Sequence, residues 1–260
     1  MQEITHVPII GAARNEESFP RTFEVTMKGI KKIACFSGGR LLDVGCGNGA
    51  FTIPIGSSFD EVHGYDMQAH NIEAFEERIG SGSKFHPHLA SASSLNFPNG
   101  YFDAVLSIET LEHVDDLQAV ANECGRVLRR GGEMVLTVPN RWYPIEGHGG
   151  TIFGKTYSRL PLVNYFPWLH RRVAHARVFT VRSLDALFCP RGFERREYCY
   201  LWPTFEHGGG PLHARIQRAA RWLYPVMRFF EASSLRMFGA SIVIRYVRTQ
   251  ARAEFGALPH

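Results

Sequence analysis

The chain lacks the features of a secreted, disulfide-bonded or membrane-spanning protein. Its 260 residues include only five cysteines, with no Cys-x-x-Cys pair, so neither a disulfide framework nor a zinc cage is predicted. No apolar run approaches the ~18–20 residues of a membrane-spanning helix. Residues 1–11 have no basic stretch followed by an apolar one, so no secretory leader is predicted. We therefore expect a cytoplasmic protein.

Lysine is also scarce, and the charge is unevenly distributed. Only five of the 29 basic residues are lysines. Residues 1–140 hold 11 Lys or Arg against 18 Asp or Glu, a balance of −7, whereas residues 141–260 hold 18 against 7, a balance of +11. Such a split predicts that the C-terminal part meets an anionic group or surface. The alternative is an Arg-rich surface that contacts only solvent.

Strands and helices alternate along the first 140 residues. The composition, with 45% hydrophobic and 21% charged residues, is that of a globular domain. A helix over 117–128 is expected to end at 129–132, because basic residues followed by glycine close a helix. The βαβ rhythm predicts an α/β fold with a mostly parallel sheet and helices on both faces. The other elements expected here are a helix at 68–79 and strands at 40–44, 61–66, 83–88, 102–108 and 133–138.

Pro139 interrupts this rhythm, and residues 140–180 are interpreted as an insertion because they are rich in Pro, Gly and aromatic residues. Regular structure is expected to return with a helix at 181–188, a strand at 193–201, a helical stretch at 212–238 and a last strand at 240–247.

The most informative segment is LLDVGCGNG, residues 41–49. A strand leads directly into a turn with Gly45, Gly47 and Gly49, where the absence of Cβ atoms lets the backbone approach a ligand. The next strand ends in Asp66, whose carboxylate can accept hydrogen bonds from both hydroxyls of a ribose. Together these residues predict an adenosine-binding half-site.

A nicotinamide dinucleotide is the alternative ligand, since Gly45-x-Gly47-x-x-Ala50 also fits the GxGxxG/A pattern. Asp43 argues against it, because its charge would repel a pyrophosphate at the helix N-terminus. The same carboxylate would favour a sulfonium or ammonium group. The sequence after residue 140 also lacks a second mononucleotide-binding half.

LLDVGCGNG, Asp66, FDAVLSIETLEHVDD and RVLRRGGEMVLTVPN together resemble the class I S-adenosylmethionine-dependent methyltransferases, in particular their small-molecule branch. The resemblance is specific over 38–140 and looser over 180–247. It implies a Rossmann-like sheet of seven strands, with the last strand antiparallel between the fifth and sixth and an insertion after the fifth.

On this resemblance, the chain is expected to be a single methyltransferase domain over 1–260. Its parts would be N-terminal lid helices (1–39), a cofactor-binding core (40–140), a substrate or cap insertion (141–180) and the C-terminal half of the sheet (181–248).

The resemblance also implies the residues that contact S-adenosylmethionine, which becomes S-adenosylhomocysteine. Family members often place an Asp where this chain has Ser91, and a neutral Ser accepts a weaker hydrogen bond from adenine. The expected contacts are Asp43, Gly45, Cys46, Gly47, Gly49, Asp66, Met67, Ser91, Ala92, Ser93, Ile108 and Glu109.

Candidate catalytic residues follow the strands, because ligands of open α/β sheets bind at the carboxyl ends. His148, in a glycine-flanked loop after the fifth strand, is the leading candidate for a general base. His207, in a similar loop after the sixth strand, is second, and His113 is third. No metal is expected, although a site shared by His148, His207 and a carboxylate is an alternative.

Arg141, Tyr143, Glu146 and Arg177 are the candidate substrate contacts. The sequence has no Asn/Asp-Pro-Pro-Tyr/Phe tetrapeptide, no Pro-Cys pair and no RNA-binding module, so a nucleic-acid acceptor is not expected. The remaining acceptor classes are a small molecule, a sugar and an anionic or lipid-linked molecule. We expect methylation on an oxygen of such an acceptor. Carbon methylation of a quinone-like or isoprenoid acceptor is one alternative, and a cofactor-binding scaffold without transferase activity is another.

The stretch 212–238 is amphipathic, with an apolar face opposite a row of arginines. A helix packed on the sheet with a solvated basic face is the simplest interpretation. The alternatives are peripheral contact with an anionic membrane and a homodimer interface.

Overall fold

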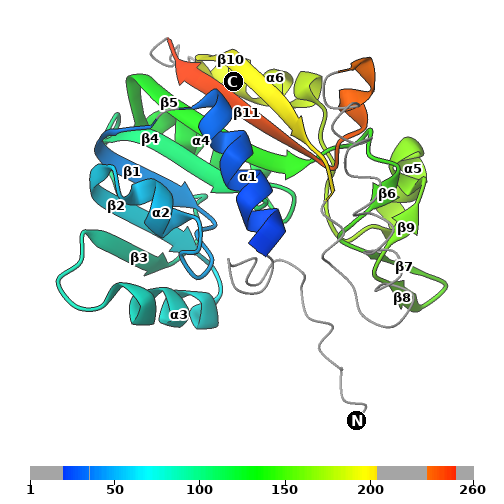
Figure 1. Cartoon of the computed structure of the whole chain (residues 1–260), viewed down its shortest axis with the longest axis horizontal. Coiled ribbons are helices and arrows are strands. Elements are labelled where there is room, and N and C mark those ends of the chain that lie inside the picture. The colour runs from blue at the N-terminus through cyan, green and yellow to red at the C-terminus, as the bar shows by residue number, and fades with distance from the viewer. Residues whose placement is uncertain (1–19, 35, 204–232, 250–260) are drawn as a thin grey trace, which may run out of the picture.

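A seven-stranded sheet organises the structure, a computed structural model that describes residues 20–34, 36–203 and 233–249 (Figure 1). The strand order is β10-β11-β5-β4-β1-β2-β3. β11 is antiparallel to β5 and β10, and the other neighbouring strands are parallel. The predicted α/β fold, including the position of the antiparallel last strand, is therefore confirmed. The strands are β1 (Gly38–Val44), β2 (Phe59–Asp66), β3 (Phe85–Leu89), β4 (Phe102–Ile108), β5 (Leu128–Pro139), β10 (Phe193–Leu201) and β11 (Ser241–Arg248).

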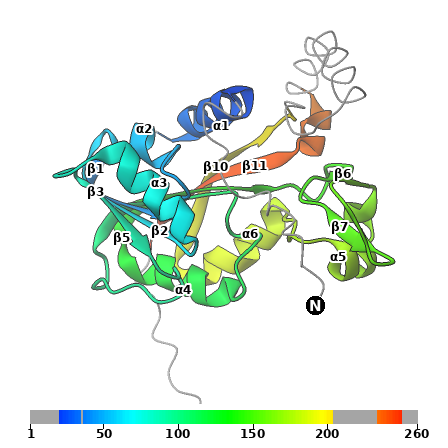
Figure 2. The ribbon, with the colours of Figure 1, turned by 90° about the horizontal axis from the view of Figure 1, so that it is seen from below.

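Helices cover both faces of the sheet, with α1 (Pro20–Ile33) on one side and α4 (Leu117–Val127) and α6 (Val181–Phe188) on the other (Figure 2). Because side chains alternate along a strand, the consecutive residues Leu41 and Leu42 belong to different core clusters. Leu41 packs with the α1 side, and Leu42 with the α4 and α6 side. Both side chains are fully buried, which accounts for the unbroken apolar run that predicted β1. The shorter α2 (Thr52–Gly56) and α3 (Ala69–Ile79) follow β1 and β2.

The predicted helix over 117–128 is confirmed as α4 to within one residue, but residues 129–132 belong to the strand β5 and not to the last turn of that helix. The helix α4 ends at Val127, and β5 begins at the next residue, Leu128. Between Leu128 and Glu133 the register with β4 shifts, and Gly131 has a φ of 74°. The glycines therefore form an irregularity within β5, which the local pattern of basic residues and glycine does not distinguish from a helix end.

The insertion stands outside the main sheet, beside the end of β5 (Figure 1). Asn140 is the first residue of the insertion and anchors it. Its side-chain amide donates to the carbonyls of Met237 and Gly239, both at 2.7 Å. Phe179 at its far end donates a backbone hydrogen bond to Pro139 O. Between them lie two small sheets and two helical segments: β6 (Ile145–Glu146) with β9 (Leu160–Pro161), β7 (Gly150–Ile152) with β8 (Lys155–Tyr157), η1 (Val163–Tyr165) and α5 (Pro167–Val173).

Several arginines of the basic C-terminal part bind the acidic N-terminal part of the same chain. Arg245 forms an ion pair with Glu133 at 2.8 Å, and Arg191 donates to the Asn122 side chain at 2.8 Å. Such contacts between the two halves account for part of the charge split without any external anion.

The predicted helical stretch 212–238 lies largely outside the described residues. Its described end, Ser234–Phe238, is a 3₁₀ helix, η3, that precedes β11. Among the described helices, none combines the length and the apolar character needed to span a bilayer.

Asn140→Ala tests how far the insertion depends on its first hydrogen bonds. Asn140 is 1% exposed, so the substitution leaves two carbonyls without their donor. We expect the free energy of unfolding, measured in urea, to fall by roughly 2–3 kcal/mol. Asn96→Ala, at an exposed position, is the control and should change it by less than about 0.5 kcal/mol. Equal effects of the two substitutions would contradict the anchoring role.

Candidate active site

The turn after β1 is built from three left-handed glycines. The φ angles of Gly45, Gly47 and Gly49 are 79°, 52° and 76°, a region that residues with a Cβ rarely adopt. A Cβ on Gly47 would meet no atom within 4 Å, so its backbone faces open space. The turn is held against β2, because Gly45 N and Cys46 N both donate to Tyr65 O at 2.7 and 3.0 Å.

Asp66 lies at the end of β2 beside this turn. Its Oδ2 accepts from Gly47 N at 3.1 Å, and its Oδ1 accepts from Gln68 N at 2.8 Å and from Asn71 Nδ2 at 3.2 Å. A carboxylate has about four acceptor positions. The three bonds therefore fix Asp66 while leaving it able to accept from a ligand.

A cavity of about 880 Å³ opens along this edge of the sheet, within the size range of cofactor pockets. Residues that sequence reasoning missed include Asn71, Thr110 and, from the insertion, Tyr157 and His175. Nine of the predicted cofactor contacts line it: Gly45, Gly47, Asp66, Met67, Ser91, Ala92, Ser93, Ile108 and Glu109.

The three other predicted cofactor contacts, Asp43, Cys46 and Gly49, are buried and do not line the cavity. Asp43 accepts a hydrogen bond from Thr52 Oγ1 at 2.6 Å. Burial raises the pKa of its carboxyl to about 7, against the lowering effect of that bond. Asp43 thus supports the turn from within the core.

Glu109 has an unusual backbone at the end of β4. Its φ is 50°, although it is not a glycine. Its N–H is held by Thr137 of β5, at 2.9 Å to the carbonyl and 3.1 Å to the hydroxyl. Strained residues of this kind concentrate at functional sites, and here the conformation accompanies a carboxylate that lines the cavity.

His148 lies opposite, where the insertion meets the cavity. Its side chain is 7% exposed, and three carboxylates surround it. Nε2 is 3.5 Å from Glu112 Oε1 and 4.0 Å from Glu109 Oε2, and Nδ1 is 3.5 Å from Glu146 Oε1. The ring centroid of His113, which also lines the cavity, is 5.3 Å away.

Glu146 positions the loop that carries His148, and it is itself paired with His170, which was not predicted from the sequence. Its Oε1 accepts from His148 N at 2.8 Å, and its Oε2 lies 2.8 Å from Nε2 of His170 on α5. Burial would raise the pKa of Glu146, but the hydrogen bonds with the two histidines outweigh it and lower the pKa to about 2. The pairing with His170 spans 24 residues, so no local sequence pattern signals it.

The remaining predicted substrate contacts are dispersed. Tyr143 and Glu146 line a second, smaller cavity of about 130 Å³, which His148 and Glu109 also border. Arg177 donates to the carbonyls of Val114 and Asp115 and so ties the insertion to the loop after β4. Arg141 lines neither cavity, and His207 lies outside the described residues.

The fold and this edge define a doubly wound α/β domain with a cavity at the carboxyl ends of its parallel strands. Residues 42–136 match the family model described as a methyltransferase domain. Among curated proteins, a ubiquinone biosynthesis O-methyltransferase from Bradyrhizobium is 36% identical over 121 residues, covering 46% of this chain and 47% of the relative. This chain therefore spans about half the length of the curated relatives that it matches.

Solved structures share the fold at lower identity. An S-adenosylmethionine-dependent methyltransferase from Mesorhizobium loti is 18% identical with a TM-score of 0.61, covering 86% of this chain and 98% of that one. A phosphoethanolamine N-methyltransferase from Haemonchus contortus, in complex with S-adenosylmethionine, is 17% identical with a TM-score of 0.56, covering 87% and 53%. Over residues 42–136 the chain therefore matches a methyltransferase domain, and it shares the fold of these solved structures.

Glu146 makes the stability of the protein sensitive to acid. Its folded pKa of about 2 lies below the ordinary value near 4.3. The stabilisation is therefore present above that ordinary value and is lost as the pH falls toward 2. In urea unfolding between about pH 5 and pH 2, Glu146→Gln should lose less stability than wild type. Parallel curves for the two proteins would show that Glu146 is not the titrating group.

Proposed function

We propose that this protein transfers the methyl group of S-adenosylmethionine to a hydroxyl oxygen of a small molecule. One observation carries the proposal: the glycine turn with Asp66 and the buried His148 border the same cavity. The relatives named O-methyltransferases support oxygen as the acceptor atom.

The proposed cofactor would span the carboxyl edge of the sheet. Asp66 would accept from the ribose hydroxyls, and the open backbone at Gly47 would lie against the methionine part. Ser91 and Ser93 would lie near the adenine, where their hydroxyls are already paired with each other at 2.8 Å. Adenine would therefore rely on backbone groups of this loop.

The proposed reaction needs positioning and one proton acceptor. The acceptor oxygen attacks the methyl carbon, the carbon–sulfur bond breaks with its electrons going to sulfur, and S-adenosylhomocysteine leaves. Alignment of the two reactants supplies up to ~7–11 kcal/mol. The hydroxyl proton would pass to His148, whose loop Glu146 holds in place.

The lining of the cavity favours a neutral acceptor. Carboxylates of Glu109, Asp115 and Asp116 border it, and they would repel an anion. The guanidinium group of Arg177 is engaged by backbone carbonyls. Within the class of small or lipid-linked alcohols and phenols, we therefore propose an uncharged hydroxyl compound rather than the anionic one considered from the sequence.

Asp66→Ala should weaken cofactor binding. It removes a charged acceptor from two ribose hydroxyls, so the binding free energy of S-adenosylhomocysteine, measured by calorimetry, should fall by roughly 1.5–3 kcal/mol. Asp60→Ala, which removes an exposed carboxylate from the other end of β2, should leave it unchanged. An unaltered dissociation constant in a folded Asp66→Ala protein would refute the assignment, and no binding by wild type would refute the proposed function.

His148→Ala should slow turnover by about 10²-fold or more while the affinity for S-adenosylhomocysteine stays nearly the same. His148 comes from the insertion, opposite the glycine turn, and acts on the acceptor. His70→Ala, at an exposed position on α3, is the control. Near-normal turnover of His148→Ala with a hydroxyl acceptor would show that another group takes the proton, or that the acceptor atom is a carbon.

A further inference from the structure

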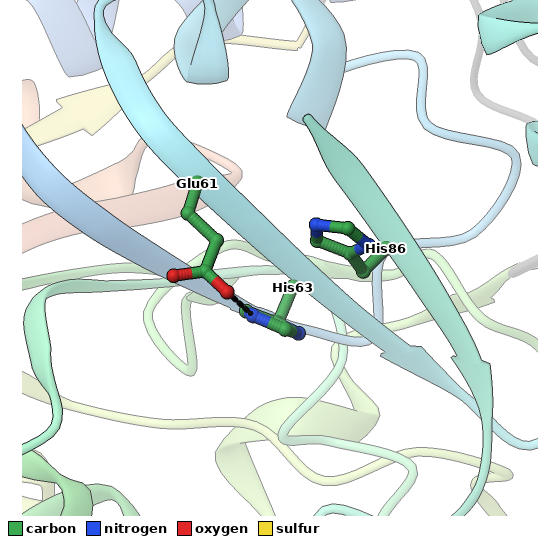
Figure 3. A group of neighbouring side chains, drawn as sticks. All are labelled: Glu61, His63 and His86. Atoms are coloured by element: carbon green, nitrogen blue, oxygen red, sulfur yellow. Dashed lines mark hydrogen bonds and ion pairs between the residues drawn. The ribbon is translucent and has the colours of Figure 1, made fainter. Parts of the chain in front are cut away.

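Two groups of glutamate and histidine side chains in the described residues bring their ligating atoms within 4.8 Å of one another. One comprises Glu61, His63 and His86 on β2 and β3 (Figure 3). The other comprises Glu112, His113 and His148 beside the cavity. Their chemistry is the same, so the spacing of the atoms decides which group is suited to hold a cation.

In the group on β2 and β3, hydrogen bonds already engage both carboxylate oxygens of Glu61. Glu61 Oε1 lies 2.9 Å from His63 Nε2, a contact that Figure 3 marks with a dashed line. Glu61 Oε2 accepts from Arg40 Nε at 3.0 Å. The rings of His63 and His86 stack with an interplanar angle of 28°. Imidazole lone pairs lie in the ring plane, so stacked rings do not converge on one point. The guanidinium of Arg40 already supplies the positive charge.

The group beside the cavity has wider spacings. His148 Nε2 is 3.5 Å from Glu112 Oε1 and 4.0 Å from Glu109 Oε2, and His113 Nε2 is 3.9 Å from Glu112 Oε1. These distances exceed the ~2.7–3.2 Å of an N–H···O hydrogen bond. Ligands at about 2.1 Å from a common ion lie about 3 Å apart when adjacent and about 4.2 Å apart when opposite, which brackets all three spacings.

The charge balance also favours a cation there. Three carboxylates, from Glu109, Glu112 and Glu146, lie within 4.0 Å of the His148 ring nitrogens. Their side chains are 12%, 0% and 1% exposed. Buried carboxylates at this density repel one another. Glu146 is paired with His170 at 2.8 Å, so a divalent ion would offset the charges of Glu109 and Glu112.

The position of Glu146 prepares His148 as a ligand. Its Oε1 lies 3.5 Å from Nδ1 of His148, on the opposite side of the ring from Nε2. Glu146 Oε1 also accepts from His148 N at 2.8 Å, so it fixes the backbone that carries the ring, while Nε2 lies on the side of Glu112. Glu146 is itself held by His170 at 2.8 Å, so the orientation is fixed from the interior of the insertion.

We propose that His148, Glu112 and His113 bind a divalent metal ion. Two imidazoles with a carboxylate suit ions such as Mn²⁺, Fe²⁺, Co²⁺ or Zn²⁺. Because His113, His148 and Glu109 line the cavity, the ion has an access route and a coordination position open to a bound molecule.

The ion would also deepen the proposed function, on which this one consequence rests. An acceptor hydroxyl bound to a divalent ion has a lower pKa and loses its proton more readily. The ion would then assist deprotonation with the proton released to water in the cavity, because His148 would serve as a metal ligand and not as the proton acceptor. Loss of turnover in His148→Ala is compatible with either role, so metal binding itself must be measured.

Mn²⁺ titration of the full chain after chelator treatment, followed by the electron paramagnetic resonance signal of free Mn²⁺, tests the site. Wild type should bind one ion per chain. His148→Ala and the isosteric Glu112→Gln should each weaken binding at least tenfold, because each removes a ligand. His63→Gln, in the hydrogen-bonded group of Figure 3, is the matched control and should bind as wild type does. Circular dichroism melts identify any variant that fails to fold.

Failure of wild type to bind Mn²⁺ at millimolar concentration would overturn the proposal. Binding that persists in both folded site variants, or that is lost in His63→Gln, would also overturn it. Calorimetry with S-adenosylhomocysteine on the same metal-free samples separates this result from the proposed function. Cofactor binding without Mn²⁺ binding refutes only the ion site, and Mn²⁺ binding without cofactor binding refutes only the methyltransferase proposal.

Discussion

The parallel pairing of β1 and β2 is the constraint on which the site depends. Their register brings Val44 beside Tyr65, so the two strands end together, and the turn after β1 donates two backbone hydrogen bonds to Tyr65 O. Asp66 continues this closure by accepting from Gly47 N. The left-handed glycines make the turn tight enough for these bonds. Strand pairing and the wall of the cavity therefore use the same few residues, and a substitution that opens the turn would disturb both.

The other side of the site depends on how the insertion is fastened. Asn140 joins the end of β5 to the segment before β11 through two hydrogen bonds, and Arg177 joins the end of the insertion to the loop after β4. Between these points, the pair of Glu146 with His170 fixes the loop that carries His148. His148 thus meets Glu109 and Glu112 because long-range contacts bring the insertion over the edge of the sheet.

Sequence reasoning succeeded where the signal was local. The glycine turn and the buried strands follow from consecutive residues, and the helix over Val181–Phe188 and the strands over Phe102–Ile108 and Phe193–Leu201 have the expected bounds. It failed at residues 129–132, where basic residues and glycine fit a helix end and a strand irregularity equally well. His170 was not identified because its partner lies 24 residues away. Arg177 was interpreted as a substrate contact because sequence cannot show that carbonyls already occupy its guanidinium.

The contacts between the two halves of the chain help to explain why the C-terminal half is basic and the N-terminal half acidic. The arginines at 177, 191 and 245 turn toward the acidic N-terminal half, where they bind carbonyls, an amide and a carboxylate. They are thereby unavailable to the cavity, whose rim carries the carboxylates of Asp115 and Asp116. A cofactor with a positive sulfonium would be attracted to such a rim, and a transferred methyl group leaves that sulfur neutral. The carboxylates would consequently bind S-adenosylmethionine more tightly than S-adenosylhomocysteine. This difference would favour replacement of the product by a new cofactor molecule after each turnover.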